Sequence, residues 1–79
     1  MANVIVYGTA VCPLCLKAKE FLKNNNIDFN DVDISAEPVR AREMMRKSRQ
    51  TQIPVIDIDG EIVVGFDRES LARALELRQ

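Results

Sequence analysis

The feature that most constrains this chain is Cys12-Pro13-Leu14-Cys15, which holds the only two cysteines in the sequence. An apolar run, Val4-Ile5-Val6-Tyr7, precedes the pair, and an amphipathic helical pattern follows it. Pro13 suits the first position of a helix, because its missing N–H needs no partner there and its φ is already helical. The cysteines are therefore expected where a buried strand ends and a helix begins.

A helix start is a position that makes a thiol reactive. The first-turn N–H groups lack intrahelical partners, and the aligned peptide dipoles add partial positive charge. Free cysteine has a pKa of about 8.5, which falls to roughly 3.5–7.5 in such settings. We therefore expect Cys12 to be a thiolate that attacks disulfides, and Cys15, one helical turn later, to attack the resulting mixed disulfide. The chain has no histidine to act as a base, so the helix terminus, with Lys17 or Lys19, would have to activate the thiol.

Other interpretations of the cysteine pair are weaker. A structural disulfide across so short a loop would remove little entropy from the unfolded chain. A closed zinc site needs about four ligands, which one chain with two cysteines does not offer. Two chains together would supply four thiolates, so a dimer that binds zinc or an iron–sulfur cluster remains the alternative. A third hypothesis uses the basic segment 40–49 as an adaptor that docks an acidic partner without chemistry.

Size and charge limit the remaining possibilities. Seventy-nine residues form one domain, 1–79, and a net charge of −1 does not indicate binding to nucleic acid. No apolar run approaches the ~20 residues of a membrane span. We expect no signal peptide, because Met1-Ala2-Asn3 carries no basic segment. Two reactive cysteines without a disulfide framework favour a cytoplasmic protein, which we expect to be a monomer that binds no metal.

The pattern of apolar residues, turns and caps predicts seven elements in the order β-α-β-α-β-β-α, which is an α/β protein. The expected strands are 4–7, 27–34, 55–58 and 61–64, and the expected helices are 13–24, from a Ser35 cap to about 47, and 68–77 after an Asp67 cap. Asp59-Gly60 predicts a tight hairpin turn. The core candidates outside the first strand and helix are Phe29, Val32, Ile34, Val39, Met44, Met45, Leu71, Ala74, Leu75 and Leu77.

Three segments together resemble the glutaredoxins, and among them the small bacterial glutaredoxin-like redoxins. They are Val6-Tyr7-Gly8 before the cysteines, Ile53-Pro54-Val55, and Gly65-Phe66-Asp67 before the last helix. The resemblance implies a thioredoxin-like fold, with a four-stranded mixed β-sheet, the first and third helices on one face and the second on the other. It also implies a nucleophilic Cys12, a resolving Cys15 and a cis peptide between Ile53 and Pro54 that faces them. The substrate-binding residues that it implies are Pro13, Leu14, Gln52, Ile53, Pro54, Gly65, Phe66 and Asp67.

The same resemblance implies a thiol–disulfide oxidoreductase without a bound cofactor. Its partners would be disulfide-containing proteins or glutathione mixed disulfides, and its electrons would come from glutathione or thioredoxin reductase. The chain has Leu14, Thr9 and Gln52-Ile53 where glutathione-using members usually have an aromatic residue, a lysine and Thr-Val. Arg46 or Arg49 is a candidate partner for a glutathione carboxylate. Gly65-Phe66 is more similar to redoxins that feed ribonucleotide reductase from thioredoxin reductase, so both electron sources remain open.

Overall fold

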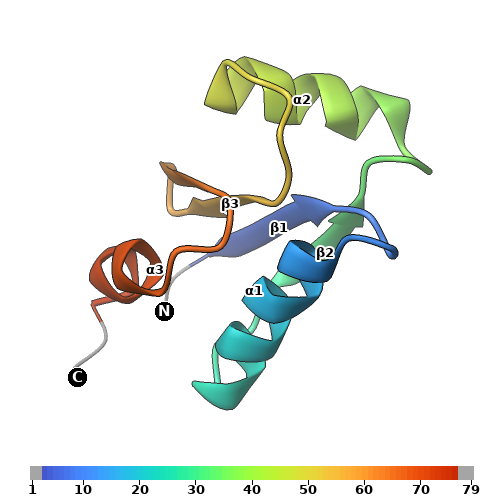
Figure 1. The fold of residues 1–79 in the computed structure, drawn as a ribbon. Coiled ribbons are helices and arrows are strands. Elements are labelled where there is room, and N and C mark those ends of the chain that lie inside the picture. The colour runs from blue at the N-terminus through green and yellow to red at the C-terminus, as the bar shows by residue number, and fades with distance from the viewer. Residues whose placement is uncertain (1–2, 77–79) are drawn as a thin grey trace.

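The structure, a computed structural model, describes residues 3–76 and contains one mixed sheet of four strands. The strands are β1 (Val4–Gly8), β2 (Asn30–Asp33), β3 (Val55–Ile58) and β4 (Glu61–Val64). They lie in the order β2-β1-β3-β4, with β1 and β2 parallel and the other two pairs antiparallel (Figure 1). The predicted element order and sheet are confirmed.

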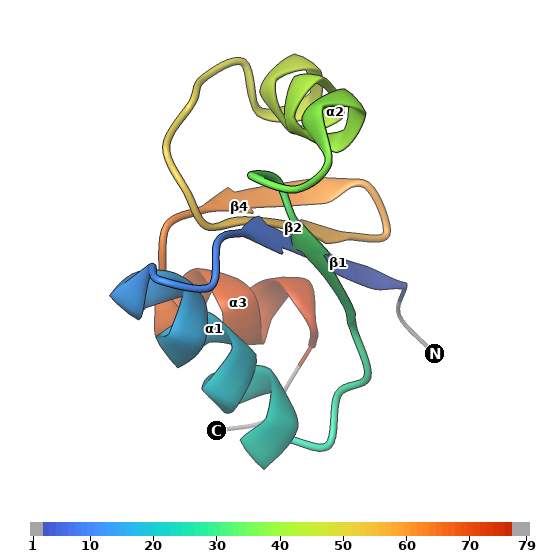
Figure 2. The same cartoon turned by 90° about the vertical axis from the view of Figure 1, so that its right-hand side faces the viewer.

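Three helices cover the two faces of this sheet. They are α1 (Pro13–Asn24), α2 (Pro38–Ser48) and α3 (Arg68–Ala74). Figure 2 shows α1 and α3 together on one face and α2 alone on the other. This is the thioredoxin-like layer arrangement that the resemblance implied, and it explains why β1 is an almost continuous apolar run: both of its faces are covered.

The core is accordingly divided by the sheet. On the α1/α3 side, the buried side chains are Val4, Val6, Ala18, Leu22, Ile56, Ile58, Val63 and Leu71. On the α2 side, they are Tyr7, Val32, Met44 and Val55. Neighbours along a strand alternate between the two clusters, as the period of two in a strand requires. No helix within residues 3–76 is long and apolar enough to cross a membrane.

The second strand is shorter than the predicted 27–34. β2 pairs only with β1, from Ile5 opposite Asn30 to Gly8 opposite Asp33, so residues 27–29 have no partner strand. Phe29 packs on the α1/α3 side, whereas Val32 and Ile34 pack on the α2 side. The break in the apolar alternation therefore marks the entry to the strand.

The start of the second helix was predicted wrongly. Ser35 does not cap α2, because its N–H and hydroxyl bind the Asp33 carboxylate instead. The helix begins at Pro38, and Glu37 occupies the cap position with φ −130° and ψ 83°. The residue before a proline is kept out of the helical region by the proline ring, so the helix has to start at the proline.

Two core candidates of the second helix were also wrong. Val39 and Met45 are 66% and 37% exposed, and Met44 alone is buried. α2 packs on the sheet through the face that carries Met44 and Lys47. Val39 and Met45 lie on the other side of the helix and are therefore exposed. The last helix ends at Ala74, with Leu75 as its C-cap, and Ala74 and Leu75 pack against the core. Leu77 lies outside the described residues.

Candidate active site

Cys12 occupies the N-cap of α1, as the sequence predicted. Its backbone is extended, with φ −92° and ψ 114°, and Pro13 follows as the first helical residue. The Cys15 N–H donates to Cys12 Sγ at 3.2 Å. Cys12 is partly exposed and both thiols are free. The helix start thus places one accessible sulfur on a first-turn N–H group, which is an arrangement that favours negative charge on that sulfur.

Cys15 is completely buried against the end of β1. A Cβ atom added to Gly8 would lie 2.5 Å from Cys15 Sγ, so only glycine leaves room for this thiol. Burial first, and then the hydrogen bond with Cys12, raises the pKa of Cys15 to about 11. The two sulfurs therefore differ: one is accessible and the other is a protected thiol. The sequence contained Gly8, but nothing local to it indicated this close approach.

At the sheet end beside the thiols, β1 and β4 end and β3 begins. Tyr7 is opposite Val55 in the β1–β3 ladder, so Pro54 lies across from Gly8 at the next position. The Gly65 N–H donates to the Pro54 carbonyl at 2.7 Å, which extends the β3–β4 ladder by one residue. The Ile53–Pro54 peptide is cis, as expected. The structure thus brings Pro54 and Gly65 to the sheet end that carries the cysteines.

The residues around Cys12 form an exposed apolar rim. Pro13 and Leu14 lie on the surface, and Leu14 is 45% exposed. Val11 was not among the predicted site residues, although it is 87% exposed beside Cys12. The sequence did show an apolar residue directly before Cys12, and the structure adds that this residue is exposed.

Gln52 and Ile53 lie in the loop that leads into β3. Gln52 is exposed, and its main chain is bound on both sides by the Gln50 side chain, at 2.6 Å to its N–H and 3.1 Å to its carbonyl. Ile53 is half-buried against the α2-side core. Gln50 was not predicted, and it organises the loop before Pro54.

Phe66 and Asp67 follow β4. The Phe66 ring packs edge-on against Phe21 with centroids 6.2 Å apart. The Asp67 carboxylate accepts hydrogen bonds from the N–H groups of Glu69 and Ser70 and from the Ser70 hydroxyl, which confirms the predicted N-cap of α3. The Ser70 hydroxyl is the main cause that holds the pKa of Asp67 below its usual value. Phe66 and Asp67 therefore have structural roles beside the site, as a ring contact to α1 and as the N-cap of α3.

Known proteins share this arrangement. A family model described as Glutaredoxin matches residues 4–63. The chain belongs to the glutaredoxin family. It is 38% identical over 79 residues to a glutaredoxin of Pseudomonas aeruginosa, covering 98% of this chain and 93% of that one. It is 44% identical over 71 residues to an uncharacterised glutaredoxin-like 8.6 kDa protein of Clostridium pasteurianum, covering 90% and 95%.

A solved glutaredoxin structure agrees with the sequence matches. The glutaredoxin of Archaeoglobus fulgidus superposes with a TM-score of 0.87 at 28% identity, covering 95% of this chain and 87% of that one. Membership of the glutaredoxins identifies the chain as a thiol–disulfide redox protein, and the thioredoxin-like fold is confirmed.

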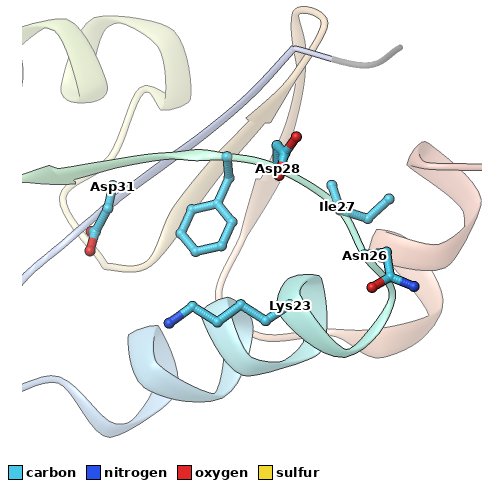
Figure 3. Close-up of a pocket in the computed structure, with 6 residues that line it drawn as sticks. Lys23, Asn26, Ile27, Asp28 and Asp31 are labelled. Atoms are coloured by element: carbon cyan, nitrogen blue, oxygen red, sulfur yellow. The ribbon is translucent and has the colours of Figure 1, made fainter.

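An open hollow with a charged lining lies away from the thiols of this glutaredoxin. It measures about 740 Å³ and is open to solvent, between the last turn of α1 and the segment that enters β2 (Figure 3). Its lining consists of Lys23, Asn26, Ile27, Asp28, Phe29 and Asp31. Lys23 lies eight residues after Cys15, which is about 12 Å along a helix. Residues 3–76 contain no group of three or more His, Cys, Asp or Glu side chains placed to bind a metal ion.

A charged network on the other face of the glutaredoxin sheet was not predicted. The Lys47 ammonium donates to the Tyr7 hydroxyl and to Asp57, each at 2.7 Å, and the Tyr7 hydroxyl donates to Glu43. Tyr7 is fully buried and Asp57 is 8% exposed. Against the opposing effect of burial, the bond to Asp57 raises the pKa of Lys47. The network fixes α2 to β1 and β3.

Some cations of α2 are paired with carboxylates of this network, and others are not. Arg40 and Lys47 pair with Glu43 or Asp57. Arg42, Arg46 and Arg49 form no ion pair with any other residue between positions 3 and 76. The helix therefore presents outward only part of the charge that its sequence suggested.

Proposed function

We propose that this glutaredoxin reduces disulfides by a dithiol reaction in which Cys12 attacks and Cys15 resolves. The observation that carries the proposal is the contrast between the two sulfurs. Cys12 is partly exposed and accepts a first-turn N–H, while Cys15 is buried one turn later with a raised pKa. An accessible, anion-stabilised sulfur suits a nucleophile, and a protected neighbour suits a second attack within the molecule.

The first step forms a mixed disulfide. Cys12 attacks one sulfur of the substrate disulfide, the substrate S–S bond breaks, and the other substrate sulfur leaves as a thiolate. The exposed apolar rim of Val11 and Leu14 supports a substrate with apolar residues beside its disulfide, such as a partly unfolded protein. In the second step Cys15 attacks Cys12, which releases the reduced substrate and leaves a Cys12–Cys15 disulfide.

Two electrons then have to enter to restore the thiols. Glutathione and thioredoxin reductase are the two sources that we propose, and the exposed Arg46 and Arg49 are candidate contacts for a glutathione carboxylate. We place the reaction in the cytoplasm, where such reductants keep catalytic thiols reduced.

The test is a disulfide-reduction assay with a small dialkyl disulfide and NADPH. One arm contains glutathione and glutathione reductase, and the other contains thioredoxin reductase, so the faster arm identifies the electron source. Cys12→Ser should abolish activity in both arms. Cys15→Ser should accumulate a mixed disulfide, detectable by mass spectrometry, and should retain activity only in the glutathione arm. Equal loss in both variants without a trapped adduct would contradict the assigned roles.

A further inference from the structure

The buried thiol of Cys15 has to lose its proton before it can attack. Burial first, and then the bond with Cys12, raises its pKa to about 11, so only about one molecule in ten thousand carries the thiolate at neutral pH. Once Cys12 is part of a mixed disulfide, its sulfur carries no charge, and burial remains as the main obstacle. A fixed positive charge near Cys15 would oppose that obstacle.

Lys19 supplies such a charge. It follows Cys15 by four residues and therefore lies on the same face of α1. Its side chain is 14% exposed, and its ammonium donates to both carboxylate oxygens of Asp31, at 3.2 and 3.1 Å. Figure 3 shows the Asp31 side chain on the side of β2 that faces α1. Lys19 is thus held beside the helix. The Thr9 backbone bond lowers the pKa of Cys15, and the charge of Lys19 lowers it further.

The other charged groups around this part of α1 are engaged elsewhere or lie farther along the helix. Asp33, on the same side of β2 as Asp31, accepts the N–H and hydroxyl of Ser35, which are the main causes that lower its pKa. β1 contributes Gly8, which has no charge. α3 places Arg68 over the ring of Phe21, six residues beyond Cys15. Lys17 is exposed. Within residues 3–76, Lys19 is the cation of α1 that an ion pair holds in place.

We propose that Lys19, fixed by Asp31, is a positioning residue for the resolving step, a role that rests on the dithiol reaction proposed above. Its ammonium stabilises the Cys15 thiolate as the proton passes to water. The thiolate attacks Cys12 Sγ, the bond between Cys12 and the substrate sulfur breaks, and that sulfur leaves as a thiolate with the electron pair. The two cysteines are oxidised to a disulfide, and the released thiol is the reduced product.

The experiment follows a single turnover with dithiobis(nitrobenzoate), whose two halves leave as yellow thiolates. The first release reports attack by Cys12, and the second reports resolution by Cys15. We expect Lys19→Gln to slow the second release by about 3- to 10-fold at neutral pH and to move its pH profile upward, without the same effect on the first. Lys19→Arg should restore the rate, because it keeps the charge.

Two variants separate this charge effect from a loss of structure. Asp31→Asn releases the Lys19 side chain but keeps its positive charge, so resolution should slow by less than it does in Lys19→Gln. Lys23→Gln, one turn further along α1, should behave as wild type. Equal slowing in Lys19→Gln and Asp31→Asn, or no pH shift in Lys19→Gln, would overturn the proposal.

The wild-type trace separates a failure of the role proposed for Lys19 from a failure of the dithiol reaction. A second release in wild type that is unaltered in Lys19→Gln would overturn the role of Lys19 alone. A wild-type protein that shows no second release would overturn the dithiol reaction, and the role of Lys19 with it. In a Cys12→Ser background, thiolate absorbance gives an independent readout: the titration midpoint of Cys15 should rise when Lys19 becomes glutamine.

Discussion

The two faces of the sheet are built from the same strands and hold their helices by different means. On the α1/α3 face, apolar side chains such as Leu22 and Leu71 fill the core, and the Cys15 N–H donates to Cys12 Sγ. On the α2 face, Tyr7, Lys47 and Asp57 form a charged anchor. The difference shows that close packing and backbone geometry place the two cysteines, with the ion pair of Lys19 and Asp31 on their side of the sheet, whereas a network of Tyr7, Glu43, Lys47 and Asp57 fixes the helix on the other face.

The largest effect is expected from emptying the packed face. Leu22→Ala should lower the free energy of unfolding by about 3 kcal/mol, because a fully buried leucine leaves a cavity between α1 and the sheet. Urea unfolding measures this. Leu16→Ala, on the same helix but 52% exposed, is the matched control and should change stability by less than about 0.5 kcal/mol. Similar losses in both would argue against a dry core on this face.

Crowding the thiols should follow in size. Gly8→Ala should cost about 1–3 kcal/mol, because the new methyl group would lie 2.5 Å from Cys15 Sγ. It should also change the rate at which Cys15 resolves a mixed disulfide. Gly60→Ala is the control: its φ is +94°, but nothing lies within 4 Å, so it strains the backbone without touching a thiol. Unaltered resolution in Gly8→Ala would show that the sulfur is not confined there.

The opposite face can be weakened without touching the sulfurs. Tyr7→Phe removes the hydroxyl that accepts from Lys47 and donates to Glu43, and should cost about 1–2 kcal/mol. Alkylation of Cys12 should keep its wild-type rate, because the ring lies on the α2 side. If Tyr7→Phe alters that rate as strongly as Gly8→Ala does, the two faces are not independent.

The smallest expected effect is a loss of folding stability at alkaline pH. The unfolded chain releases the Cys15 proton near its ordinary pKa of about 9, whereas burial raises the folded pKa to about 11. Between these values the folded state binds more protons, so the stability due to this group is present below pH 9 and falls as the pH rises, by about 1 kcal/mol between pH 9 and pH 10. The difference between wild type and Cys15→Ser isolates the group. A pH-independent difference would contradict the raised value.

Features that depend on neighbours in sequence were predicted from sequence. Pro13 at a helix start, the Asp59-Gly60 turn with both φ values positive, and Asp67 as a cap each require only a few adjacent residues. Ser35 was assigned as a cap because serine often serves as one, but the restriction before Pro38 decided the boundary instead. Prediction from adjacent residues fails where two local preferences compete.

Features that depend on tertiary contact were not predicted. Tyr7 and Lys47 are separated by 40 positions, and no periodicity connects them. The rotation of α2 about its axis, which buries Met44 and exposes Val39 and Met45, agrees with that anchor and could not be predicted from the apolar pattern of the helix. The need for glycine at position 8 likewise comes from Cys15 on another element.

Tyr7 and Gly8 are consecutive, yet one directs its side chain toward α2 and the other clears space for a sulfur on α1. Inserting or deleting one residue inside β1 would exchange these assignments, setting a phenol against the cysteines and depriving α2 of its tether. Length variation among descendants of this chain should therefore be tolerated in the loops and rejected between positions 4 and 8.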